Sequence, residues 1–303
     1  MNRVIKMSVD RNIPIPQAAY KVTEEELETH WKQYRQNFAT LRQQVERYNP
    51  DVIIIIGGDQ NEVFDKGNKV NALIFTGEES YGSNPFSGAA SRLGDTSIDM
   101  TKADHQVRYK TDVPLAKFLA NELVSKEGFD LAVSEQFKPM AGRGVPGLPH
   151  AFVNVFEIFP NLNIPTVLIY ENTYDPPAYI SAKRCYDLGS AIARIMAKEN
   201  KRVAILGSGG LSHDPGGPMH LWIDQALDKW VMNHLASGTA KELSSLWQVD
   251  SMTMRGGTGE IRAWITVAGA METMGSKATI VDYCPHLELQ TGVSFAYWLP
   301  SRN

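Results

Sequence analysis

The chain has 303 residues, enough for one large or two ordinary domains, and its 43% hydrophobic and 21% charged residues are typical of a soluble globular protein. Its formal net charge of -4 argues against nucleic acid or an anionic membrane as the main partner, and no apolar run approaches the roughly 20 residues of a membrane span. The start lacks the apolar core of a secretory signal, and Cys185 and Cys284 have no paired spacing, so we expect a reduced, cytoplasmic setting and no cysteine metal site.

A long amphipathic helix is the first element that the sequence predicts. Apolar residues from Leu27 to Tyr48 recur every three or four positions, and Thr23 with Glu26 forms a capping box at the start. A strand follows at 51–56 that is apolar on both faces, as in parallel sheets covered by helices. The turn after this strand carries Asp59 and Gln60.

Residues 66–110 are rich in Gly, Ser, Asn and Thr and have weak periodicity. We interpret this segment as a long excursion from the domain, either a lid or a decorated surface loop. Beyond it the pattern predicts a helix at 113–124, a strand at 129–133 and an irregular loop at 136–149 that contains Arg143.

The second half of the chain alternates between predicted strands and helices. Strands are expected at 166–170, 203–206, 278–282 and 293–298, and helices at 181–199, 219–235 and 260–271. Trp230 is expected to face inward from its helix. This alternation, without a clear linker, predicts an α/β fold in one domain over residues 1–303: three layers, α/β/α, around a largely parallel or mixed sheet.

The segment Gly207–His213 combines a glycine-rich exit from a buried strand with a single histidine. The following Asp214-Pro-Gly-Gly-Pro sequence blocks an immediate helix. Open α/β sheets place their chemistry at strand ends, and imidazole can exchange a proton near neutral pH. His213 is therefore a candidate acid/base, the alternative being a surface histidine on a turn.

Several motifs, taken in order, resemble class III extradiol dioxygenases of the protocatechuate 4,5-dioxygenase beta-subunit type. The resemblance covers nearly the whole chain and rests on the segments Met1–Pro14, Pro50–Asp59, Lys183–Gly189, Gly207–His213 with Gly217-Pro218, and Gly259–Trp264 with Ala268–Ala270. No single motif decides the matter, but their order and spacing together are specific.

The resemblance implies a site in which two histidines and one glutamate bind Fe(II), while a further histidine acts as acid/base. In this sequence Glu260 matches the glutamate ligand and His213 the acid/base, but the two histidine ligands fall on Asn12 and Gln60. Arg143 lies near a position where the family often has histidine, with a one-residue shift in the match.

These departures predict a changed metal site. An amide offers Fe(II) only a weak carbonyl ligand, so we expect no tightly bound iron. Asn12, Gln60, Arg143 and Ser212 are then candidates to contact a substrate, with His213 and Glu260 as a proton-transfer pair. Asn12 and Gln60 could instead satisfy turn backbone, and Glu260 could favour a helix N-terminus.

Three functions remain open on the sequence alone. The first is an enzyme that processes a small aromatic or cyclic compound by acid/base chemistry without the standard Fe(II). The second is an Fe(II)-dependent dioxygenase with unusual ligands, including a site rebuilt with Asp10 and Asp59. The third is a non-catalytic subunit paired with an active homologue, against which the retention of His213 and Glu260 weighs.

The family resemblance also implies a homo-oligomer or a complex with a homologous subunit. The remaining histidines show no partner spacing, and we expect surface or packing roles for His30, His105, His220, His234 and His286.

Overall fold

The computed structural model describes residues 15–16, 18, 21–64, 67–83, 106–137, 147–160, 162–174 and 176–299. The chain divides into two compact units. The first unit comprises residues 1–47, 181–190 and 209–303, and the second comprises residues 48–180 and 191–208. Asn12 and Arg143 lie outside the described residues, as does Asp10.

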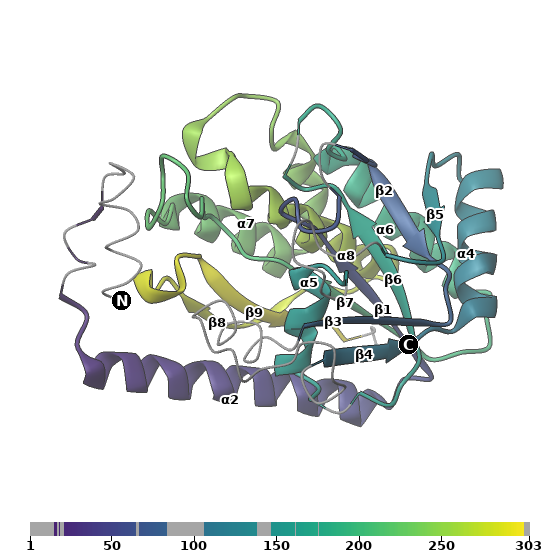
Figure 1. Cartoon of the computed structure of the whole chain (residues 1–303), viewed down its shortest axis with the longest axis horizontal. Coiled ribbons are helices and arrows are strands. Elements are labelled where there is room, and N and C mark those ends of the chain that lie inside the picture. Colours follow the sequence, from purple (N-terminus) through teal and green to yellow (C-terminus); the bar gives the residue numbers. More distant parts are fainter. Residues whose placement is uncertain are drawn as a thin grey trace. The chain divides into compact units, whose positions relative to one another are not determined.

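The second unit is built on a five-stranded sheet with strand order β5-β2-β6-β1-β7 (Figure 1). The strands are β1 (Val52–Gly57), β2 (Ala72–Phe75), β5 (Ala132–Ser134), β6 (Thr166–Glu171) and β7 (Val203–Ser208). β1 pairs in parallel with β6 and β7, and β2 pairs in parallel with β5, whereas β2 and β6 are antiparallel. The sheet is therefore mixed and mostly parallel, as the sequence predicts.

The core of this unit lies along β1. Every residue from Val52 to Ile56 is fully buried, because helices and neighbouring strands cover both faces of the strand. Helix α4 (Val113–Ser125) packs against β2 and β6, and the short α5 (His150–Val153) packs against β1. The predicted α/β fold class is confirmed by this helix-flanked sheet.

The segment 66–110 contains more regular structure than its composition suggests. β2 belongs to the central sheet, and β3 (Glu79–Ser83) pairs with β4 (Gln106–Lys110) as a separate antiparallel ribbon. These strands were not predicted because the Gly-, Ser-, Asn- and Thr-rich sequence around them has only weak periodicity. Residues 84–105 lie outside the described part, so the lid remains a prediction.

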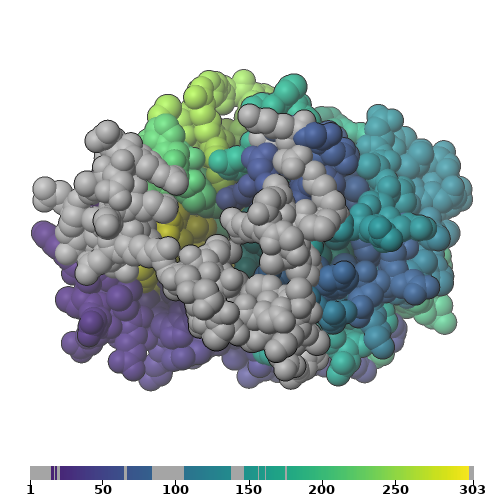
Figure 2. Space-filling view, in the orientation of Figure 1, coloured from purple at the N-terminus to yellow at the C-terminus, as the bar shows by residue number. Residues whose placement is uncertain are grey.

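The first unit contains the long helix α2 (Glu24–Tyr48) and the antiparallel pair β8 (Thr279–Cys284) and β9 (Val293–Tyr297). The predicted capping box is present: the Thr23 amide donates to Glu26 Oε2 at 2.8 Å, and the Glu26 amide donates to Thr23 Oγ1 at 3.2 Å. Tyr34 of α2 packs with Cys284 and Phe295, so the helix covers this strand pair. The exposed face of α2 forms the purple surface in Figure 2.

Helices α7 (Gln225–Ser237) and α8 (Ile261–Thr273) complete the first unit, with the 3₁₀ helices η4 (Ala240–Ser245), η5 (Met252–Met254), η6 (Gly256–Glu260) and η7 (Leu287–Leu289). The remaining elements are α6 (Ala182–Met196) and η3 (Asn154–Glu157), and α6 contributes residues to both units. No helix in the described ranges is both long and apolar enough to cross a bilayer.

Two predictions about α7 are wrong. The helix begins at Gln225 rather than at position 219, because the Asp224 side chain accepts the Leu227 amide at 3.0 Å and caps the helix there. Trp230 is 39% exposed instead of facing inward. The other predicted helices are present, with their ends shifted by up to three residues.

Candidate active site

The backbone of the loop that follows β7 is fixed by hydrogen bonds to residues distant in sequence, all within the first unit. The Leu211 amide donates to the Gly292 carbonyl at 2.9 Å, and the Gly292 amide donates to the Ser212 carbonyl at 2.9 Å. The His213 amide donates to Thr258 Oγ1 at 3.0 Å, and the Thr258 amide donates back to the His213 carbonyl at 2.9 Å. These paired contacts hold His213 between η6 and the start of β9.

The His213 imidazole is buried, and a hydrogen bond at Nδ1 helps to orient the ring. Nδ1 lies 2.8 Å from the Leu211 carbonyl oxygen, and only a protonated Nδ1 can donate to that acceptor. In the neutral ring this leaves the lone pair on Nε2. Nε2 lies 3.6 Å from Glu260 Oε2, and both side chains are less than 10% exposed.

Glu260 is the last residue of η6 and immediately precedes α8. Its Oε2 accepts the Gly210 amide at 2.7 Å, which joins the carboxylate to the glycine-rich loop. The sequence pattern predicts a helix starting at Glu260, and in the structure the regular helix begins one residue later. The carboxylate is thus aimed at the His213 loop.

A glycine at position 257 is required by the close approach of the imidazole. A Cβ added to Gly257 would lie 2.1 Å from His213 Nε2. A Cβ added to Gly210 would lie 2.9 Å from His213 Cε1. Real atoms are not found this close, so these two backbone segments can flank the ring only without side chains.

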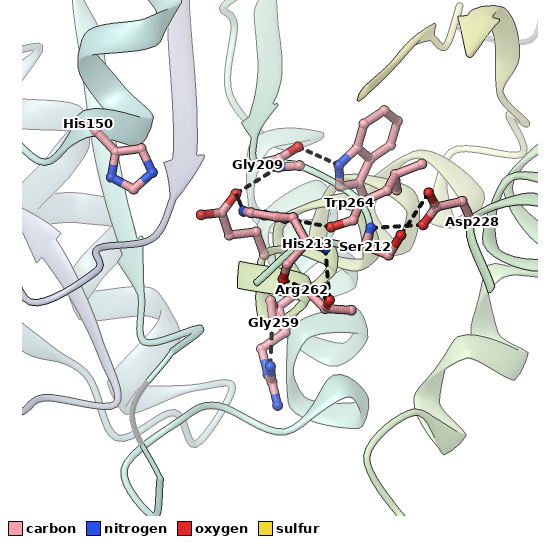
Figure 3. Close-up of polar contacts among 12 residues, drawn as sticks. His150, Gly209, Ser212, His213, Asp228, Gly259, Arg262 and Trp264 are labelled. Carbon is pink, nitrogen blue, oxygen red and sulfur yellow. Dashed lines mark hydrogen bonds and ion pairs between the residues drawn. The ribbon is translucent and has the colours of Figure 1, made fainter. Parts of the chain in front are cut away.

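Ser212 is held by a buried carboxylate (Figure 3). Its amide donates to Asp228 Oδ1 at 2.8 Å, its hydroxyl donates to Asp228 Oδ2 at 3.0 Å, and the Tyr283 hydroxyl donates to the same Oδ2 at 2.7 Å. Ser212 Oγ also accepts the Asp224 amide at 2.8 Å. Asp228 is fully buried, and this burial raises the pKa of its carboxyl above the ordinary value although the hydrogen bonds oppose the shift.

Two tryptophans contact this region. Trp264 contacts the loop, and Trp247 stacks with an arginine at the start of α8. The Trp264 indole N–H donates to the Gly209 carbonyl at 2.8 Å. The buried Arg262 guanidinium lies 3.7 Å from the centre of the Trp247 ring and donates to the Gly259 carbonyl at 3.2 Å. A cation stacked on an aromatic face is stabilised by the ring's negative potential, so this pair can keep the η6–α8 junction in place.

A cavity of about 210 Å³ opens beside His213 within the first unit. It is lined by Ser212, His213, Asp214, Met219, Trp222, Ile223, Asp224, Thr253 and Thr258. A cavity of about 150 Å³ can hold a benzene molecule, so this space suits a single aromatic ring. The wall offers an indole, aliphatic side chains and a few polar groups, the usual mixture of a small-molecule pocket.

Comparison with known proteins identifies the family. Residues 15–294 match the family model described as the catalytic LigB subunit of aromatic ring-opening dioxygenase. The chain belongs to this family.

Among curated relatives, a 2,3-dihydroxyphenylpropionate/2,3-dihydroxicinnamic acid 1,2-dioxygenase from Azotobacter vinelandii is 27% identical over 186 residues, which is 60% of this chain and 49% of that protein. The protein of the same description from Rhodococcus globerulus is 26% identical over 196 residues, 64% of this chain and 53% of that protein. The chain thus spans about half the length of the curated relatives that it matches. The extradiol dioxygenase resemblance is confirmed at the level of the family, while the beta-subunit type stays a prediction.

In this family member, Gln60 and Ser212 are the other predicted site residues that lie in the described part of the chain. Gln60 lies in the second unit, partly buried in the turn after β1. In that turn the buried Asp59 carboxylate accepts the amides of Glu62, Val63 and Phe64 at 2.7–3.2 Å, so Asp59 shapes the backbone around Gln60. Burial raises the pKa of Asp59. The structure therefore brings together His213, Glu260 and Ser212 in the first unit.

Sequence reasoning missed two residues that hold the His213 loop and one contact in the second unit. Asp228 and Thr258 hold the His213 loop from other elements, and no local pattern marks either of them. In the second unit, Glu62 Oε2 lies 2.6 Å from His150 Nδ1 and accepts the His150 amide at 2.8 Å. This contact could not be predicted from local spacing, because 88 positions separate the two residues.

Proposed function

We propose that this chain binds a small phenolic, catechol-like or ring-derived substrate beside His213 and processes it by proton transfer, without the standard Fe(II) site of its family. The observation that carries the proposal is the buried pair in which His213 Nε2 lies 3.6 Å from Glu260 Oε2. Nδ1 is hydrogen-bonded to the Leu211 carbonyl, so in the neutral ring Nε2 carries the lone pair that can accept a proton.

The proton transfer would use both residues. His213 Nε2 accepts the proton of a substrate hydroxyl and later returns it to a carbon or a leaving group. The Glu260 carboxylate balances the positive charge that the ring carries between these events. Hydrolysis, C–C cleavage and decarboxylation of a ring-derived compound all require such a transfer. The reaction and the substrate remain proposals, with Asn12, Gln60, Arg143 and Ser212 as candidate binding residues.

The donor set supports the metal-free proposal. The positions that the family resemblance assigns to the iron ligands are Asn12, Gln60 and Glu260. Of these only Glu260 can carry a negative charge, and its Oε2 already accepts the Gly210 amide. Two neutral amides and one carboxylate do not fit Fe(II), which is held by two imidazoles and a carboxylate in facial-triad oxygenases.

A second candidate is Fe(II)-dependent extradiol cleavage with unusual ligands. It is favoured by the family description and by the relatives, which are described as 1,2-dioxygenases. A non-catalytic subunit, the third reading of the sequence, is less well supported, because a scaffold needs neither a buried acid/base histidine nor its carboxylate. For any of the three we expect the chain to form oligomers.

Ligand binding in the presence and absence of iron separates these candidates. Calorimetry with 2,3-dihydroxyphenylpropionate and related catechols is performed on the full chain in chelator and, anaerobically, after Fe(II) loading, and oxygen uptake by both preparations is then measured in air-saturated buffer. The proposal predicts binding with the same Kd in both conditions and no iron-dependent oxygen uptake. Binding or oxygen uptake that requires Fe(II) would contradict it and favour the second candidate.

A further inference from the structure

Two histidines and a glutamate meet where α2 approaches the connection between β8 and β9, within the first unit. His30 lies on α2, while His286 and Glu288 lie at η7. The potential ligand atoms of the three residues all lie within 4.8 Å of one another. His30 Nδ1 is 2.5 Å and His286 Nδ1 is 3.8 Å from Glu288 Oε1, and the two imidazole rings stack with centroids 3.5 Å apart.

The glutamate of this cluster has an unused oxygen. Its side chain is 12% exposed, and Oε2 is buried without a hydrogen-bond partner among the described residues. A buried carboxylate oxygen without a partner is costly, and such an atom in a native fold calls for a bound ion or water. This observation is independent of the spacing of the three residues, and a bound cation would account for it.

The cluster is held in place by groups behind it. The hydroxyl of the buried Tyr34 lies 2.7 Å from His286 Nδ1, and this contact orients the imidazole ring. Gln33 Nε2 and Asn37 Nδ2 donate to Asp282 Oδ2 at 2.6 and 2.7 Å. These contacts tie α2 to β8 on the same side, so the histidines are positioned before any ion binds.

We propose that His30, His286 and Glu288 bind a divalent transition-metal ion of the Zn²⁺ type, which fastens α2 to the β8–β9 connection. Two imidazoles and one carboxylate suit such ions, with water or another ligand in the remaining position. Donor atoms in a tetrahedral zinc site are roughly 3.3 Å apart. The 2.5 Å distance between His30 Nδ1 and Glu288 Oε1 would therefore lengthen by about 0.8 Å when the ion replaces the proton between these atoms. These residues differ from the iron-ligand positions of the family, and the inference does not rest on the proposed function.

Metal titration of the full chain tests this site. Protein prepared with chelator and then freed of it is titrated with Zn²⁺ by calorimetry and with Co²⁺ by visible absorbance. The variants are His30→Gln and Glu288→Gln, the second of which retains the shape of the side chain and can still accept a hydrogen bond. His234→Gln is the matched control, because His234 is a partly buried histidine that contacts Thr239 in the structure.

Metal ions bound at other sites contribute equally to the variants and to the unmodified chain, so the difference in binding reports on the proposed site. We expect His30→Gln and Glu288→Gln each to lose one ion per chain or to bind it at least about tenfold more weakly, since loss of even an outer partner costs about 10–100-fold. Zn²⁺ should raise the melting temperature of the unmodified chain and of His234→Gln, but not of Glu288→Gln. Undiminished binding by both variants, or no saturable binding by the unmodified chain, would overturn the proposal; if His30→Gln does not fold, Glu288→Gln decides.

Discussion

β1 and β7 lie side by side and end at partner residues, Gly57 and Ser208, yet the segments that follow them are held in different ways. After β1, the turn is held by its own aspartate, since Asp59 accepts amides three to five positions further on. After β7, the loop is held by residues from other elements, among them Asp228 and Thr258.

The two segments differ in which residues determine their backbone conformation. The β1 turn is specified locally, so it depends on a few consecutive residues. The His213 loop is specified by the packing of its unit, because its amides and its serine hydroxyl are bound by partners 12 to 81 positions away. Within its own turn, the His213 side chain contacts the Leu211 carbonyl through Nδ1. The substitutions below test this contrast.

The largest effect is expected for His213→Gln. Glutamine can still form hydrogen bonds but cannot take up a proton near neutral pH, so we expect turnover of a ring substrate to fall by about 10²–10⁴-fold. Initial rates are measured beside His234→Gln, which should match the unmodified chain. A rate within a few fold of the unmodified chain would remove His213 from the proton-transfer step.

Gly257→Ala should disturb the His213 site by steric pressure alone. The new Cβ would lie 2.1 Å from His213 Nε2, so the ring or η6 must move, and overpacking of this kind costs about 1–3 kcal/mol. Gly58→Ala provides the counterpart in the β1 turn, where the added Cβ would lie 2.3 Å from Thr173 Oγ1. Both variants should lose stability in urea denaturation. Unchanged stability and activity in Gly257→Ala would show that the imidazole is not confined as described.

Asp228→Asn and Asp59→Asn compare the two kinds of support directly. Each change replaces one acceptor oxygen by a donor in a buried cluster, and we expect losses of about 1–3 kcal/mol in the free energy of unfolding. Hydrogen exchange should differ between them. Asp59→Asn should speed amide exchange mainly in its own turn, at residues 62–64. Asp228→Asn should speed exchange near its own position and also in the loop around Ser212, 16 positions away. The same local pattern in both variants would break the contrast.

Substitution at the N-terminal ends of β1 and β7 should have the smallest effect on stability. Asp51 and Arg202 form an exposed ion pair, and hydrogen bonds from Arg202 lower the pKa of Asp51 to about 2 from the ordinary 3.8. A lowered acid pKa stabilises the fold above the ordinary value, and this stabilisation is lost as the pH falls through about 2. The stability difference between the unmodified chain and Asp51→Asn should therefore be small and constant from pH 7 to 5, and should shrink below pH 4. A difference that grows on acidification would contradict this assignment.

The sequence predicted those features that depend on neighbouring residues. The apolar run from Val52 to Ile56 predicted a buried strand, and the Thr23–Glu26 capping box marked the start of α2. His213 was found because a glycine-rich exit from a strand is a local pattern. The family resemblance, and not the pattern alone, paired it with Glu260.

The features that sequence reasoning missed depend on tertiary contacts. β2 has only four residues, and its place beside β6 follows from packing rather than from periodicity. Asp228 resembles any acidic residue in the first turn of a helix until the structure buries it beneath Ser212. His30 and His286 showed no partner spacing, because 256 positions separate two rings that stack in the fold.

Iron content that depends on Glu260 tests the central claim most directly. The unmodified chain and Glu260→Gln are loaded with Fe(II) anaerobically, desalted and analysed for iron, so that iron bound at any other cluster is common to both. The account predicts equal iron in the two proteins. One additional iron per chain in the unmodified protein would contradict it and show that Glu260 still serves a family-type metal site.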